Sequence, residues 1–254
     1  MTQPTAAMLV IGDEILSGRT RDANAHHLAT VMTETGIKLT EIRVVPDEPE
    51  AITGAVNELR GRVDHLFTSG GIGPTHDDIT ADCVAAAFGV HIDVRDDARA
   101  IIAAHAEATG RELNEARLRM AWIPNGAALI DNPVSHAPGF ILGNVHVMAG
   151  VPSIFRAMLD GLRPRLRGGP PLLNHAFRVN APEGDLAAPL GAVAAAHADV
   201  SMGSYPFYVA GSEGGPGAAL ILRFADPAAL VVAAEALRAA LAEMGAPVEE
   251  LPPV

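Results

Sequence analysis

Three glycines and two adjacent aspartates fall within one short stretch, residues 68–80, which reads Thr-Ser-Gly-Gly-Ile-Gly-Pro-Thr-His-Asp-Asp-Ile-Thr. The stretch follows the apolar run 63–67 and precedes an alanine-rich helical pattern. Glycines after a strand let a ligand approach the backbone N–H groups, and a helix N-terminus favours an anion. Asp77 and Asp78 can hold the divalent cation that accompanies a phosphate. The spacing predicts a phosphate site, and the alternative is a tight turn with an aspartate capping the helix.

A second polar turn follows the apolar run 6–11. It reads Gly-Asp-Glu-Ile-Leu-Ser-Gly-Arg over residues 12–19. Asp13 and Glu14 can add oxygen ligands for a metal, and the arginine can meet a phosphate. Asn24, at the start of the next helical pattern, offers an amide at the same end. A solvated turn is the alternative interpretation.

A third acid, Asp47, occupies the turn after the alternating run 38–45, where a cap for the following helix is the alternative. Strand patterns at 6–11, 38–45 and 63–67 alternate with helical patterns at 22–35, 48–59 and 81–88. This order predicts an α/β fold, with a parallel sheet covered by helices on both faces. Ligands of such sheets bind at the carboxyl ends of the strands, so the three polar turns are expected to converge.

The chain is predicted to have two domains. Residues 1–165 form the α/β domain, and the Pro- and Gly-containing segment 163–171 contains the linker. Residues 172–254 alternate strand and helix patterns in a different order, which predicts a small α+β domain. No catalytic constellation is evident in the second domain.

The composition excludes several classes of protein. The 254 residues are 49% hydrophobic and 19% charged, which predicts a packed core. The net charge of −12 disfavours nucleic acid as a partner. The chain has one cysteine, Cys83, no apolar run long enough for a membrane span and no signal-peptide pattern at its start. We therefore expect a cytoplasmic protein without a membrane partner.

The three turns, in this order, resemble the MoaB/Mog molybdopterin-binding domain family. The similarity is closest to the N-terminal part of competence/damage-inducible protein A. Asn132-Pro133, the run 137–140 and the run 150–152 extend the resemblance across residues 5–165. The second domain is similar in position to the small domain that follows in the same group.

The resemblance implies a three-layer α/β domain that binds a phosphorylated pterin, such as molybdopterin, or a nucleotide. In the competence-protein branch, the same pocket hydrolyses the pyrophosphate of ADP-ribose-like or FAD-like substrates with a divalent cation (Mg, Mn or Co). The adjacent pair Asp77-Asp78 points to that branch, with both as metal ligands and Asp47 as a third catalytic acid. The resemblance also implies a homodimer or homotrimer. Candidate binding residues are Gly12, Asp13, Glu14, Ser17, Gly18, Asn24, Ser69, Gly70, Gly71, Gly73, Pro74, Thr75, Thr80, Pro138, Gly139 and Gly150.

The sequence departs from the family pattern at two positions. Ala149 replaces the usual proline, and Ile154 stands where a glutamate is common. The amidase domain that often follows in the competence protein is not among these residues, so NMN deamidation is not expected. The alternative to a pyrophosphatase is therefore a non-hydrolytic molybdopterin-binding protein, or one that adenylylates molybdopterin or inserts its metal.

Overall fold

The computed structural model describes residues 3–208 and 215–251. The chain forms two compact units, Met1–Gly169 and Pro170–Val254. The division falls inside the predicted linker, whose first residues form a short 3-10 helix, η1 (Arg163–Arg165). No helix among the described residues is long and apolar enough to cross a membrane.

The first unit is built on a six-stranded sheet with the order β2-β1-β3-β8-β7-β6. Four neighbouring strands, β2, β1, β3 and β8, are parallel, and β7 is antiparallel to both of its neighbours. The mostly parallel α/β fold expected from the sequence is confirmed. The strands are β1 (Thr5–Ile11), β2 (Lys38–Val45), β3 (His65–Ser69), β6 (Ala128–Ile130), β7 (Gly139–Leu142) and β8 (Val145–Met148).

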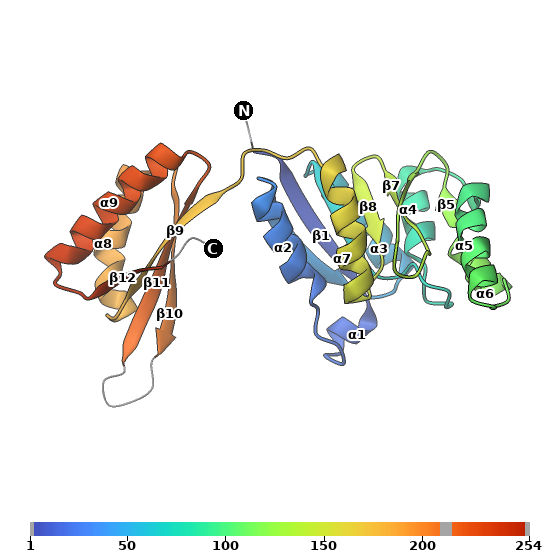
Figure 1. Cartoon of the computed structure of the whole chain (residues 1–254), viewed down its shortest axis with the longest axis horizontal. Coiled ribbons are helices and arrows are strands. Elements are labelled where there is room, and N and C mark those ends of the chain that lie inside the picture. Colours follow the sequence, from blue (N-terminus) through green and yellow to red (C-terminus); the bar gives the residue numbers. More distant parts are fainter. Residues whose placement is uncertain (1–2, 209–214, 252–254) are drawn as a thin grey trace. The chain divides into compact units, whose positions relative to one another are not determined.

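Helices cover both faces of this sheet. Figure 1 shows α2 (Asn24–Glu34) and α7 (Pro152–Leu162) on one face, with α3 (Pro49–Arg60) and α4 (Thr80–Phe88) on the other. Side chains of β1 alternate between the two cores, as expected for a strand buried on both sides. Met8 packs in the cluster of α2 and α7, and Leu9 packs in the cluster of α3 and α4.

The segment between α4 and β6 packs beside α4 at one edge of the first unit. It contains β4 (Ile92–Val94), α5 (Asp96–Ala108), α6 (Glu115–Arg119) and β5 (Trp122–Pro124), and β4 pairs with β5. Asn114 caps α6, because its side chain accepts the backbone N–H of Arg117. This segment places β5 close to α4.

The second unit is a four-stranded antiparallel sheet with the order β10-β11-β9-β12. The strands are β9 (Leu173–Val179), β10 (Ser201–Tyr208), β11 (Pro216–Phe224) and β12 (Val248–Leu251). The helices α8 (Glu183–Ala196) and α9 (Pro227–Glu243) share its core, and Asp226 caps α9 by accepting the Ala228 N–H. The expected α+β composition is confirmed.

Candidate ligand-binding site

The polar turns meet because the strands that precede them are parallel and in register. Ile11 pairs with Val45 at the ends of β1 and β2, and Ser69 pairs with Met148 at the ends of β3 and β8. Hydrogen bonds continue into the turns, since the Gly12 N–H donates to the Val45 carbonyl at 3.2 Å. The Gly70 N–H likewise donates to the Met148 carbonyl at 3.2 Å. The four carboxyl ends therefore form one edge, where doubly wound folds bind ligands.

The loop after β3 depends on glycine at its first two positions. Gly70 has φ +108° and Gly71 has φ +66°, a region that other residues rarely adopt. A Cβ at Gly70 would collide with the Ile11 carbonyl, and one at Gly71 would collide with the Thr80 hydroxyl. Buried Thr80 anchors the loop, because its hydroxyl donates to the Gly70 carbonyl at 3.0 Å and its N–H to the Gly71 carbonyl at 2.9 Å.

Asp78 holds the shape of the same loop. Its Oδ2 accepts the backbone N–H of Thr75 at 2.8 Å and the Thr75 hydroxyl at 2.5 Å. A Cβ at Gly73 would lie 2.7 Å from this oxygen, so the carboxylate passes directly over the glycine. The N-cap of α4 is Ile79, which makes no side-chain cap. Asp78 therefore does not act as the helix cap that local sequence offers as an alternative.

Asp47 lies where the turns after β1 and β2 meet. Its Oδ2 accepts the backbone N–H of Asp13 at 2.9 Å. Burial raises the pKa of Asp47, and the negative charges of Asp13, Glu14 and Asp77 raise it further, against the lowering effect of the Asp13 N–H. The acids of all three turns therefore share one electrostatic environment. The following helix, α3, is preceded by Glu48 and has no side-chain cap, so Asp47 does not cap it.

Asp77 faces solvent beside this group. Its side chain is 61% exposed. Asp77 and Asp78 thus have different surroundings although they are adjacent in sequence. Asp78 is engaged with its own loop, while Asp77 remains open to a ligand.

Asn24 connects the end of β3 to the turn that follows β8. Its Nδ2 donates to the Ser69 hydroxyl and to the Gly150 carbonyl, both at 2.7 Å. Its Oδ1 is buried and lacks a hydrogen-bond partner among the described residues. A Cβ at Gly150 would lie 3.2 Å from the Gly70 Cα, so these two turns pack closely. The structure thus gives Asn24, Ser69 and Gly150 a role in holding the site together.

The remaining candidates are spread around this edge. Asp13 opens the short helix α1 (Asp13–Leu16), which Ser17 and Gly18 end. Pro74 is exposed at the tip of the glycine loop. Gly139 begins β7, where a Cβ would collide with the Val147 carbonyl.

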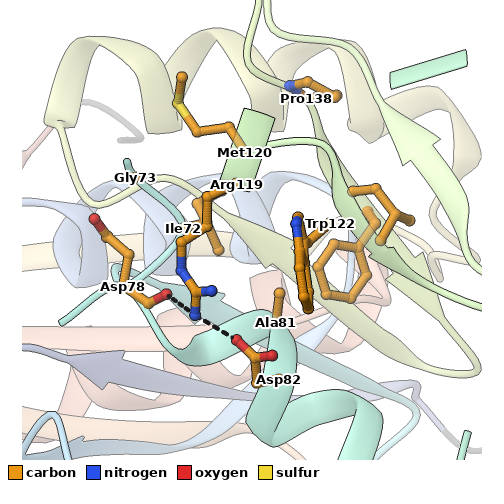
Figure 2. Close-up of a pocket in the computed structure, with 12 residues that line it drawn as sticks. Ile72, Gly73, Asp78, Ala81, Asp82, Arg119, Met120, Trp122 and Pro138 are labelled. Atoms are coloured by element: carbon orange, nitrogen blue, oxygen red, sulfur yellow. Dashed lines mark hydrogen bonds and ion pairs between the residues drawn. The ribbon is translucent and has the colours of Figure 1, made fainter. Parts of the chain in front are cut away.

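A pocket lies beside the glycine loop. Figure 2 shows Arg119 between Asp78 and Trp122 in this pocket. The Arg119 Nη2 donates to Asp82 Oδ2 at 2.8 Å and lies 3.4 Å from the Asp78 carbonyl. Its guanidinium carbon is 5.6 Å from the centre of the Trp122 ring. The lining residues are Gly71, Ile72, Gly73, Asp78, Ala81, Asp82, Arg119, Met120, Trp122, Ile123, Pro138 and Phe140.

The wall formed by Arg119 and Trp122 was not predicted from the sequence. These residues come from α6 and β5, a segment without a recognisable motif. The one available signal was Trp122 itself, the only tryptophan in a chain that is 4% aromatic, with an arginine three residues before it.

The described carboxylates at this edge do not form a complete set of metal ligands. No group of three or more His, Cys, Asp or Glu side chains among residues 3–208 and 215–251 is arranged to hold one. Magnesium commonly needs only one or two carboxylates, because waters and substrate phosphates complete its shell. The acids around Asp47 fit that kind of site, and they do not form a preassembled cage.

Comparison with known proteins follows this geometry. Residues 7–168 match the family model described as a probable molybdopterin-binding domain, which is more than half of the chain. The chain belongs to this molybdopterin-binding domain family. Residues 171–249 match the model described as the middle domain of FAD synthase. The glycine loop and the acidic turns therefore lie within the molybdopterin-binding domain.

Curated relatives share this domain. A protein of Caldivirga maquilingensis is 36% identical over 166 residues, which are 64% of this chain and 65% of that protein. A CinA-like protein of Citrifermentans bemidjiense is 38% identical over 167 residues, which are 64% of this chain and 40% of that protein. The chain thus spans less than two thirds of the length of either relative.

A solved structure of CinA from Thermoplasma acidophilum, described as having unknown function, is also similar. It has a TM-score of 0.59 and 33% identity, and the match covers 64% of this chain and 98% of that one. The expected similarity to the competence-protein group is confirmed for the first unit.

Proposed function

We propose that the first unit binds a phosphorylated pterin or nucleotide at the carboxyl edge of its parallel sheet and hydrolyses a pyrophosphate bond with a divalent cation. The observation that carries this proposal is the shared environment of Asp13, Asp47 and Asp77. These acids come from three separate turns, next to a loop that has no room for side chains at Gly70 and Gly71. A carboxyl with a raised pKa, such as that of Asp47, at a ligand-binding edge is a mark of functional sites.

The glycine loop supplies the phosphate contacts. The N–H groups of Gly71, Ile72 and Gly73 donate to no other group in the described part of the chain. Successive free N–H groups in such a loop form a concave anion site. Thr80 and Asp78 fix the loop from either end, so the N–H groups are held in place before a ligand arrives.

The acids supply the cation site. Asp77 and Asp47 would hold the divalent ion, which offsets the charge on the phosphate oxygens when it is bound. Asp78 shapes the loop and borders the phosphate. When bound, the ion would also lower the pKa of a water in its shell, and the proton of that water would pass to solvent. Water then adds to one phosphorus and the bridging oxygen leaves with the other phosphate, so each pyrophosphate yields two monoesters.

The test is AMP release from ADP-ribose and from FAD with magnesium, manganese or cobalt, measured by chromatography. We expect metal-dependent release that EDTA abolishes. Asp77→Asn should reduce it by at least about 100-fold, and Asp93→Asn, an exposed acid on β4, serves as the control. Failure of the purified protein to release AMP with all three metals would overturn hydrolysis.

Binding without hydrolysis is the second candidate, and one observation favours it. Ile154, where the family resemblance leads to a glutamate being expected, packs against the apolar cluster of α2 and α7. No acid can act from that position. This candidate, which includes adenylylation or metal insertion, predicts retention of molybdopterin at micromolar concentration without AMP release. Fluorescence of the bound pterin measures it.

A further inference from the structure

The pocket beside the glycine loop has one polar and one aromatic wall. Arg119 and Trp122 line the cavity from α6 and β5, and Gly71 and Gly73 of the glycine loop line it too. Figure 2 shows Arg119 and Trp122 side by side in this pocket. Ile72, Met120, Pro138 and Phe140 complete the lining with apolar surface. A phosphate on the loop N–H groups would therefore border a space lined by both polar and apolar side chains.

Arg119 is held by an ion pair and keeps one N–H without a hydrogen bond to the described residues. Its Nη2 forms an ion pair with Asp82 on α4, so the net charge of the two side chains together is close to zero. Its Nε is buried and has no hydrogen-bond partner within the described ranges 3–208 and 215–251. Buried donors seldom lack a hydrogen bond, so this N–H points to an acceptor that the described residues do not provide.

Trp122 offers a surface for a flat ring. The side chain is half-buried, and its indole lies beside the guanidinium of Arg119. Indole and guanidinium groups both stack on heteroaromatic rings, and a ring with carbonyl or imino acceptors can also accept from Arg119. Neither a sugar nor a simple phosphate has both a flat aromatic face and acceptor atoms in its plane.

We infer that Trp122 and Arg119 form the subsite for the planar heteroaromatic ring, pterin or nucleobase, of a ligand whose phosphate lies on residues 71–73. Trp122 contacts the ring by stacking, and the guanidinium of Arg119 donates to a ring acceptor. Met120, Pro138 and Phe140 line the same pocket beside this subsite. This inference rests on the proposed phosphate site.

The chain contains a built-in reporter, because Trp122 is its only tryptophan. Two probes form a matched pair: α,β-methylene-ADP, which carries a base and cannot be hydrolysed at its methylene bridge, and methylenediphosphonate, which has no ring. With magnesium present, we expect α,β-methylene-ADP to change the tryptophan fluorescence in a saturable way. Methylenediphosphonate should bind by calorimetry and leave the fluorescence unchanged.

Variants locate the effect. Trp122→Leu and Arg119→Ala should each weaken α,β-methylene-ADP binding about ten-fold by calorimetry and change methylenediphosphonate binding by less than about three-fold. Trp122→Phe should restore most of the affinity. Arg117→Ala, on the same helix and outside the pocket lining, is the matched control. Thermal melting identifies any variant that is unfolded. If Trp122→Leu is unfolded, the affinity of Trp122→Phe and the fluorescence response of the unmodified protein test the ring subsite instead.

Two failures are distinguishable. Unchanged α,β-methylene-ADP affinity in folded Trp122→Leu and Arg119→Ala would overturn the ring subsite and leave the phosphate site standing. Absence of binding of both probes to the unmodified protein would overturn the phosphate site and the ring subsite together.

Discussion

The backbone N–H of Asp13 donates to the carboxylate of Asp47 at 2.9 Å and joins the turn after β1 to the turn after β2. The two residues are 34 positions apart in sequence. The bond fixes Asp47 beside the charges of Glu14 and Asp77 and keeps it half-buried. A single hydrogen bond thereby places one acid where three turns meet.

Asp47→Asn is expected to abolish most of the AMP release without lowering the melting temperature. Because the pKa of Asp47 is raised in the folded state, its favourable contribution is present at low pH and is lost as the pH rises through that value. At pH 7 the asparagine, which can still accept the Asp13 N–H, should therefore melt at the same temperature or higher. AMP release should fall by at least about 100-fold. A lower melting temperature at pH 7 would contradict the unfavourable environment of the carboxylate.

Gly71→Ala is expected to damage both the loop and the binding of phosphate. The new Cβ would have φ +66° and would collide with the Thr80 hydroxyl, so Thr80 or the loop must move. Gly110→Ala is the matched control, since Gly110 has φ +64° with open space around it. The control should lose about 1 kcal/mol of unfolding free energy, and Gly71→Ala about 2–4 kcal/mol. Urea denaturation measures both, and equal losses would show that the Thr80 contact is unimportant.

The buried pair of histidines on β3 and β8 is expected to make the first unit acid-sensitive. His146 Nε2 and His65 Nδ1 are 3.1 Å apart. Burial, reinforced by the charges of His65 and Arg165, lowers the pKa of His146 to about 3. The unfolded chain gains this proton near pH 6.5, so stability should fall between about pH 6.5 and 3, by at most about 1.4 kcal/mol per pH unit.

His146→Leu should flatten that slope, as measured by urea denaturation at pH 5, 6, 7 and 8. His76→Gln provides the control, because the side chain of His76 is 98% exposed. An unchanged pH slope in His146→Leu would mean that other groups cause the acid sensitivity.

The fold was predictable because its signals are local. The apolar run 6–11 is followed by Gly12, and the run 63–67 is followed by the turn that contains Gly70. The order of these strands with the helices leaves few topologies other than a parallel sheet. The convergence of Asp13, Asp47 and the glycine loop follows from that topology alone. The short β12, Val-Glu-Glu-Leu, was not predicted, since its pairing with β9 comes from the tertiary fold.

The detailed roles within the site were less predictable. Asp77 and Asp78 are adjacent acids in the sequence, and only the hydrogen bonds from Thr75 show that Asp78 is turned onto its own loop. Asn24 reads as a helix start with a free amide, yet its Nδ2 is used by Ser69 and Gly150. The Arg119–Trp122 wall depends on how α6 and β5 pack beside α4, which no local pattern encodes.

The central claim is that Asp47 and Asp77, from separate turns, hold one metal–phosphate complex. Electron paramagnetic resonance of Mn²⁺ tests it directly, because the signal of free Mn²⁺ falls when the ion is bound. We expect the protein with α,β-methylene-ADP to bind one Mn²⁺, the double variant Asp47→Asn with Asp77→Asn to lose this binding, and Asp93→Asn to retain it. Undiminished Mn²⁺ binding in the folded double variant would contradict the account.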